Sequence, residues 1–234
     1  LKKVKNPQIN TDYYPVSYFY IWKIWLSTFV SNKLMLGAVF VFIIMATVFV
    51  KTIKNIRLLI DNPLLPYAFI LGFWSIVLEM TILSLFQLKT GDLTWKLGML
   101  FAAFMAGTAF GAYKFRKRSS KKIIGLIFSG ASSLTLLLLA SLSIIPFLGP
   151  NTLFLLLILF LMATGFAVGA FFPLAVNRDK TQAHRIYAFD LWGSALGGFM
   201  AAAFFMPLLG MGKILLILAG LTAIFIWPSF RIKR

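Results

Sequence analysis

Residues 72–87 read GFWSIVLEMTILSLFQ, an apolar stretch with one carboxylate, Glu79, at its centre. The stretch lies within a longer apolar segment, 67–88, which matches the roughly 20 helical residues needed to cross a hydrocarbon core about 30 Å thick. Backbone N–H and C=O groups meet no water in lipid, so a crossing segment must satisfy them within a helix. The stretch therefore predicts a membrane-spanning helix that carries an acid.

The whole chain has the composition of an integral membrane protein. Of its 234 residues, 60% are hydrophobic, 16% are aromatic and 12% are charged, whereas soluble domains carry about 25% charged residues. The lack of cysteine excludes thiolate metal sites, and a single histidine, His184, excludes a haem held by two histidines of this chain. No nucleophile–base arrangement is recognisable. We expect no catalytic residue, metal or cofactor in this chain.

Seven segments are long and apolar enough to cross a bilayer as helices. Their ends are marked by charge clusters, or by Gly and Pro in turns such as FLGPNT and LLGMG. The predicted spans are 34–53, 67–88, 95–113, 123–146, 152–175, 186–208 and 212–229. We therefore expect an all-α, polytopic transmembrane helix bundle over 34–229, followed by a basic cytoplasmic tail at 230–234.

The distribution of Lys and Arg orients this bundle. Fifteen of them fall in the loops 51–66, 114–122 and 177–185 and in the tail, which share one side if the seven helices alternate. The opposite loops hold three, Lys89, Lys96 and Lys213. Because cytoplasmic loops are enriched in Lys and Arg, the C-terminus is predicted in the cytoplasm of a bacterial-type inner membrane. The net charge of +17 then favours anionic lipid headgroups as partners, and not nucleic acid.

Residues 1–33 allow two topologies. The segment 15–30, PVSYFYIWKIWLSTFV, is crowded with aromatic residues around Lys23, which is typical of a segment at the membrane interface. Seven crossings then place the lysine-rich N-terminus outside, against the charge bias. An eighth crossing by 15–30 removes that conflict, and both alternatives stand.

Small residues recur every four positions in three predicted helices, and this spacing lets helix backbones approach closely in lipid. They are Ala103, Gly107 and Gly111, then Gly165 and Gly169, then Gly193 and Gly197. The favoured interpretation is packing within the bundle, and the alternative is a homodimer.

Two acids lie within predicted helices. Glu79 is twelve residues into its helix, about 18 Å along the axis at 1.5 Å per residue, and a mid-membrane acid costs roughly 2.5–3.5 kcal/mol on insertion scales. Asp190 follows Arg185 by five residues, near a helix start, where the helix dipole and nearby basic residues favour an acid. Ser75 and Gln87 are expected to form a thin polar stripe with Glu79.

Two interpretations of Glu79 remain open, because no Lys or Arg lies at its depth in any predicted helix. It is a protonated acid that ties helices together by hydrogen bonds, or it belongs to a site for a cation, a polyamine or a proton. Ser75, Glu79, Gln87 and Asp190 form the candidate ligand-binding set.

Several stretches together resemble a known family. They are INTDYYPVSYFY, GFWSIVLEM, GMLFAAFMAGTAFGA, GFAVGAFFPLAV and RIYAFDLWGSALGGFMAAAFFMPLLG. They are similar to the end of the soluble domain and to the membrane domain of integral-membrane spermidine/spermine synthase-like proteins, across nearly the whole chain. The helices also loosely resemble half of a major-facilitator transporter, with a basic loop after a Gly-rich helix.

The resemblance implies a membrane domain without its catalytic partner. In that family the soluble α/β domain transfers aminopropyl groups to polyamines, and this chain begins about where such a domain would end. Glu79, Gln87 and Asp190 fall on motif positions of the family's membrane domain. The first functional hypothesis is thus a non-catalytic domain that anchors the protein and binds or passes a cationic amine. The alternative is a scaffold subunit of a larger membrane complex, for example an electron-transfer complex, with membrane or soluble partners.

The two topologies predict opposite accessibility at the N-terminus. The chain has no cysteine, so Lys3→Cys introduces a unique thiol. With seven crossings, a membrane-impermeant maleimide labels that thiol in intact cells. Labelling only after permeabilisation would support eight crossings instead.

Overall fold

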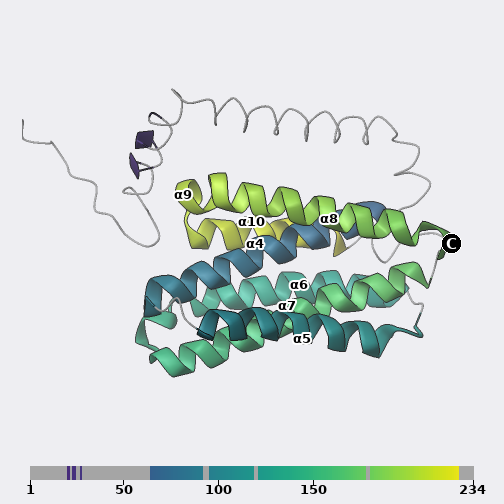
Figure 1. The fold of residues 1–234 in the computed structure, drawn as a ribbon, viewed down its shortest axis with the longest axis horizontal. Coiled ribbons are helices and arrows are strands. Elements are labelled where there is room, and N and C mark those ends of the chain that lie inside the picture. Colours follow the sequence, from purple (N-terminus) through teal and green to yellow (C-terminus); the bar gives the residue numbers. More distant parts are fainter. Residues whose placement is uncertain are drawn as a thin grey trace, which may run out of the picture.

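The computed structural model describes residues 64–91, 95–118, 121–177 and 180–226, together with residues 20, 21, 23, 24 and 27. The predictions for 1–33, apart from those five residues, fall outside this part of the chain, as do the span at 34–53 and the tail at 230–234. What is described is helical, with no strand among these residues. The helices lie side by side with their axes roughly aligned (Figure 1).

The elements follow the predicted segments closely. They are α4 (Leu64–Thr90), α5 (Trp95–Phe115), α6 (Lys121–Ser141), the 3-10 turn η1 (Ile145–Phe147), α7 (Pro150–Val176), the 3-10 turn η2 (Lys180–Gln182), α8 (Ala183–Met200), the π-helix η3 (Ala201–Phe205), α9 (Met206–Leu209) and α10 (Met211–Ile224). Within the described residues, five helices are long and apolar enough to cross a membrane: α4, α5, α6, α7 and the continuous run from α8 through α9.

Two predicted spans differ from the structure. The segment 123–146 is α-helical only to Ser141, and a 3-10 turn follows with Pro146 inside it. Proline lacks a backbone N–H and its ring clashes with the carbonyl four residues earlier, which accounts for the earlier end. The last segment, 212–229, is α-helical over Met211–Ile224, 14 residues, and its residues 227–229 lie outside the described part of the chain.

Contacts between helices fix their directions. Gly107 and Gly111 of α5 pack on Met162 and Phe166 of α7, so these two helices run parallel. In α6 and α10, Ser132 donates a hydrogen bond to the Ala219 carbonyl, while Phe128 stacks on Phe225 further along, so this pair is antiparallel.

Helix α4 relates the other helices to one another. Tyr67 contacts Phe128 of α6, and Trp74 donates a hydrogen bond to Thr135 of α6. Each residue of the second contact lies seven positions, about two turns, beyond its counterpart in the first, so these helices are parallel. Near its end, Phe86 contacts Phe154 close to the start of α7, so α7 is antiparallel to α4. Consecutive long helices therefore alternate in direction, as crossings of a membrane must.

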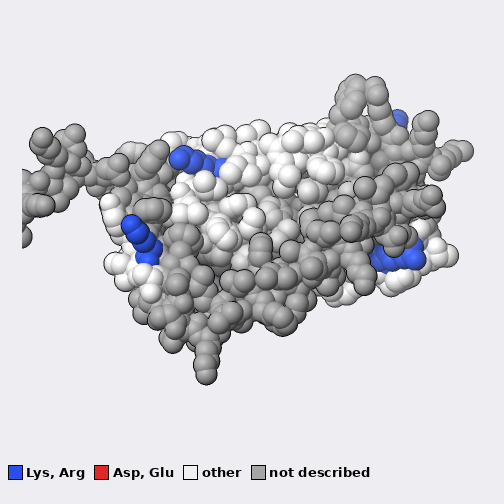
Figure 2. Space-filling view, turned by 90° about the horizontal axis from the view of Figure 1, so that it is seen from above, with Lys and Arg blue, Asp and Glu red and all other residues white. Residues whose placement is uncertain are grey.

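This alternation gathers the basic loops at one end of the bundle. The ends of α5 and α7 and the starts of α6 and α8 meet there, and the Asn177 side-chain amide donates to the carbonyl oxygens of Arg116 and Arg118 at 2.7 and 3.1 Å. Figure 2 shows the described Lys and Arg of one face towards its two ends. The long apolar helices of the described residues are compatible with membrane insertion.

Helix α4 lies at the centre of the bundle. More than half of its residues are buried, and it contacts α7, α8 and α10 as well as α6. A helix that is apolar on all sides is one that other helices surround. By contrast, α5 buries only a narrow stripe that includes Ala103, Gly107 and Gly111.

Two helix pairs approach at backbone distance through glycine. A Cβ added to Gly107, Gly111, Gly165 or Gly169 would collide with backbone atoms of the partner in the α5–α7 pair. Gly193 and Gly197 pack in the same way on Phe69 and Phe73 of α4. The predicted small-residue faces are therefore used inside the chain, and the homodimer alternative loses its proposed surface.

Replacement of Gly107 should weaken the α5–α7 pair. In Gly107→Ala the new methyl group collides with the Met162 carbonyl, and such overpacking costs about 1–3 kcal/mol. Denaturant titration of the reconstituted protein should show this loss. Gly98→Ala, in the same helix but with nothing within 4 Å of the added Cβ, should be neutral or stabilising. Equal effects of the two substitutions would contradict the packing described.

Candidate functional site

Glu79 lies near the middle of α4, as the sequence predicts, and only 5% of its surface is exposed. Helix α4 is enclosed by four other helices, so the carboxylate is held away from both ends of the bundle. An ionised carboxylate in such surroundings is stabilised only by a partner of opposite charge or by hydrogen bonds.

Glu79 differs in this respect from every other buried polar side chain of the described residues. The other six are hydroxyls, and each donates a hydrogen bond to a backbone carbonyl: Ser75, Thr81, Ser132, Thr135, Thr164 and Thr222. No described residue forms a hydrogen bond or an ion pair with Glu79. The interpretation of Glu79 as an acid that ties helices together therefore gains no support here.

The face of α4 that carries Glu79 is the one that packs on α8. Glu79 follows Gly72 by seven residues, almost two full turns. The two positions therefore lie within about 20° of each other around the helix axis. Gly72 lies directly against the backbone of Asp190 in α8. Glu79 therefore lies further along the same contact between α4 and α8.

A π-helix lies at the level of Glu79. Because Phe69 opposes Gly193 and Phe73 opposes Gly197, the same register brings Glu79 alongside η3, and η3 contacts α4. Within η3 the Met206 N–H donates to the Ala201 carbonyl, five residues back. Pro207 follows directly; proline has no N–H and its ring clashes with the carbonyl four residues earlier, so a wider turn relieves the clash. Such π-helical turns occur frequently at functional sites.

The predicted polar stripe is only partly formed. Ser75 is buried near Glu79, but its hydroxyl donates to the Gly72 carbonyl of its own helix at 2.9 Å. Gln87 is exposed at the end of α4, so the expectation that it joins the stripe is wrong. Eight residues advance the helix by about 80° beyond two full turns, which carries Gln87 off the face of Glu79.

Asp190 lies deeper in its helix than the sequence suggested. Helix α8 begins at Ala183, so Asp190 is in its third turn and no acid occupies the first. The expected stabilisation by the helix start is therefore weak, since the dipole effect fades within the first turn. Asp190 also forms no ion pair with a described basic residue.

Asp190 instead packs against Gly72. A Cβ added to Gly72 would lie 2.8 Å from a carboxylate oxygen of Asp190 and 2.9 Å from the hydroxyl of Ser194. The glycine thus leaves room for two polar side chains at the contact between α4 and α8. Ser194 and Gly72 escaped the sequence reasoning; the spacing of four between Asp190 and Ser194 was the available signal, because it places both on one helix face.

Glu79 and Asp190 share one interface but lie on different levels. Asp190 is level with Gly72, and Glu79 is seven residues further along α4, about 10 Å by helical rise. The structure thus brings Ser75, Glu79 and Asp190 to one helix pair without joining the two carboxylates. The described residues contain no group of three or more His, Asp or Glu able to hold a metal ion.

Comparisons with known proteins add no relative. No family model, no curated protein and no solved structure matches the chain. Function must therefore be argued from the contact between α4 and α8.

Enlarging Gly72 should disturb this contact specifically. In Gly72→Ala the methyl group meets the backbone and carboxylate of Asp190, so α4 and α8 must separate, at a cost of about 1–3 kcal/mol in unfolding free energy. Gly198→Ala is the matched control, because its Cβ meets only Ile76, at an ordinary 3.8 Å. Thermal unfolding in detergent compares the two, and a Gly72→Ala protein as stable as Gly198→Ala would refute the tight contact.

Proposed function

We propose that this chain is a membrane-embedded, non-catalytic domain, similar to that of spermidine-synthase-like proteins, which binds a cationic amine between α4 and α8. Glu79 carries the proposal. It is a buried carboxylate to which no described residue offers a positive charge or a hydrogen bond. A protonated amine supplies both, because an ammonium group is a cation with up to three N–H donors.

Asp190 favours an amine with more than one charge. Its carboxylate lies along the same helix pair, about 10 Å from Glu79 by helical rise, and it also lacks a described basic partner. An extended polyamine carries ammonium groups on a comparable spacing. We therefore assign Glu79 to one ammonium group and Asp190, beside Ser194, to another.

The proposed location is a bacterial-type inner membrane, with seven crossings and a cytoplasmic C-terminus. The alternating helix directions support an ordered series of crossings, and the basic residues gathered at one end support a cytoplasmic face there. In this arrangement Glu79 lies at mid-depth and Asp190 lies closer to the cytoplasmic face.

Helix α5 favours a second candidate, a scaffold subunit of a larger membrane complex. Outside its contact with α7, it exposes Phe101, Met105 and Tyr113. Large aromatic and Met side chains of this kind suit either lipid or the helix of another subunit. In a scaffold subunit, Glu79 and Asp190 would bind no ligand.

Calorimetry with spermidine separates the two candidates. Glu79→Gln keeps the side-chain volume but removes the charge, so the amine should lose most of its affinity in detergent, and Asp190→Asn should weaken it less. Charge-assisted hydrogen bonds are worth about 1.5–3 kcal/mol each, equivalent to about 10- to 100-fold in affinity.

Gln87→Ala is the control, because Gln87 is exposed and off the Glu79 face. It should bind spermidine as the parent protein does. Unchanged affinity in Glu79→Gln, or no spermidine binding by the parent protein, would reject the amine site and leave the scaffold as the better candidate.

A further inference from the structure

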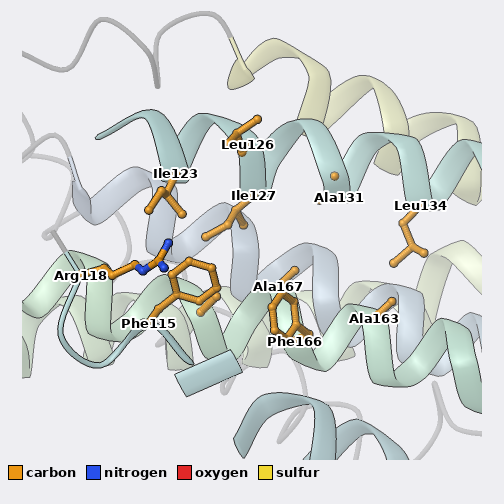
Figure 3. Close-up of a pocket in the computed structure, with 12 residues that line it drawn as sticks. Phe115, Arg118, Ile123, Leu126, Ile127, Ala131, Leu134, Ala163, Phe166 and Ala167 are labelled. Atoms are coloured by element: carbon orange, nitrogen blue, oxygen red, sulfur yellow. The ribbon is translucent and has the colours of Figure 1, made fainter. Parts of the chain in front are cut away.

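A groove opens between α6 and α7, on the side of these helices away from the Glu79 interface. It encloses about 410 Å³ and is lined almost entirely by apolar side chains. In Figure 3, Phe115 and Arg118 lie at one end and Leu134 and Ala163 at the other, with Ile127 and Phe166 between. Among the described residues that line it, the groove is therefore an apolar channel with one cationic side chain, Arg118, at one end.

Small residues create the groove. Gly130 and Ala131 of α6 face Ala163, Ala167 and Ala170 of α7 across it. A Cβ added to Gly130 would meet nothing within 4 Å, so this position borders open space. The small residues between α5 and α7 let the two helix backbones pack closely. The small residues between α6 and α7 instead border a groove that no described side chain fills.

The dimensions of the groove suit a hydrocarbon chain. On α6 its lining runs from Ile123 to Leu134, about 16 Å by helical rise, which is about half of a hydrocarbon core roughly 30 Å thick. It starts at the basic end of the bundle and so spans one leaflet.

Arg118 gives the groove its charge preference. Its guanidinium lies 5.7 Å from the centre of the Phe115 ring, and among the described residues it has no carboxylate partner. The Asn177 side-chain amide donates to the Arg118 carbonyl at 3.1 Å, which fixes the backbone of this residue beside the groove. A guanidinium held in this way offers a fork of N–H donors suited to a phosphate.

We propose that this groove binds one anionic phospholipid from the leaflet at the basic end of the bundle. One acyl chain lies between α6 and α7 against the small residues, and the headgroup phosphate lies against Arg118. The site uses neither Glu79 nor Asp190, so it is independent of the amine site. It turns a general attraction between basic loops and anionic lipid into a defined position for one molecule.

Native mass spectrometry of the whole chain tests the acyl part of the site. The protein is released from micelles that contain phosphatidylglycerol or phosphatidylcholine with identical acyl chains. Gly130→Phe places a ring in the groove without a backbone clash, and should abolish the retained phosphatidylglycerol. Gly220→Phe is the matched control, since Gly220 is also an exposed helical glycine with nothing within 4 Å of an added Cβ. It should retain the lipid.

The charge part of the site is tested by Arg118→Gln. One basic residue near a lipid surface contributes about 1 kcal/mol, so this variant should lower phosphatidylglycerol retention about fivefold. Arg116→Gln is the control, because Arg116 stacks on Tyr113 at 4.5 Å and does not line the groove. It should change retention little.

Three outcomes would overturn the proposal: equal retention of the two lipids by the parent protein, equal retention by Gly130→Phe and Gly220→Phe, or equal losses in the two arginine variants. Circular dichroism melting of each variant in detergent shows that it is folded. A Gly130→Phe protein that fails to fold is replaced by Ala167→Phe, which fills the same groove from α7 and must also release the lipid.

Discussion

The close approach of helix backbones at glycine is the constraint on which the rest of this fold depends. The α5–α7 and α4–α8 pairs meet where glycines face carbonyl oxygens of the opposite helix. In lipid there is little hydrophobic force between helices, so association relies on close packing of this kind. Because α4 is held against α8 in this way, Glu79 is buried between helices without a described partner.

Most of the helical architecture was predictable from length and polarity alone. Backbone N–H and C=O groups in lipid must form hydrogen bonds within their own segment, which favours helices. The alternation of basic and nearly neutral loops predicted the direction in which each helix crosses. The sequence also identified the glycines that pack, because spacing by four is a local pattern. It did not reveal which faces pair with each other, since pairing depends on contacts between residues far apart in the chain, such as Phe69 and Gly193, 124 positions apart.

The candidate site was predictable only in part, for the same reason. Glu79 stands out in any reading as a mid-helix acid, and the structure keeps it buried. The accompanying residues were harder to predict. Gln87 lies on another face of α4 than Glu79, and Gly72 and Ser194 become part of the site only because α8 packs against α4. The π-helix before Pro207 likewise depends on how one proline is accommodated in a long helix.

The parallel pairing of the helices also bears on how the chain is assembled. Helices that run parallel cannot be neighbours joined by a short turn, and α4 is followed by α5, α6 and α7 before its partner α8 appears. During synthesis α4 must therefore enter the membrane and wait while about a hundred further residues emerge. The final packing step, in which α8 closes over α4, is then the event that shelters Glu79.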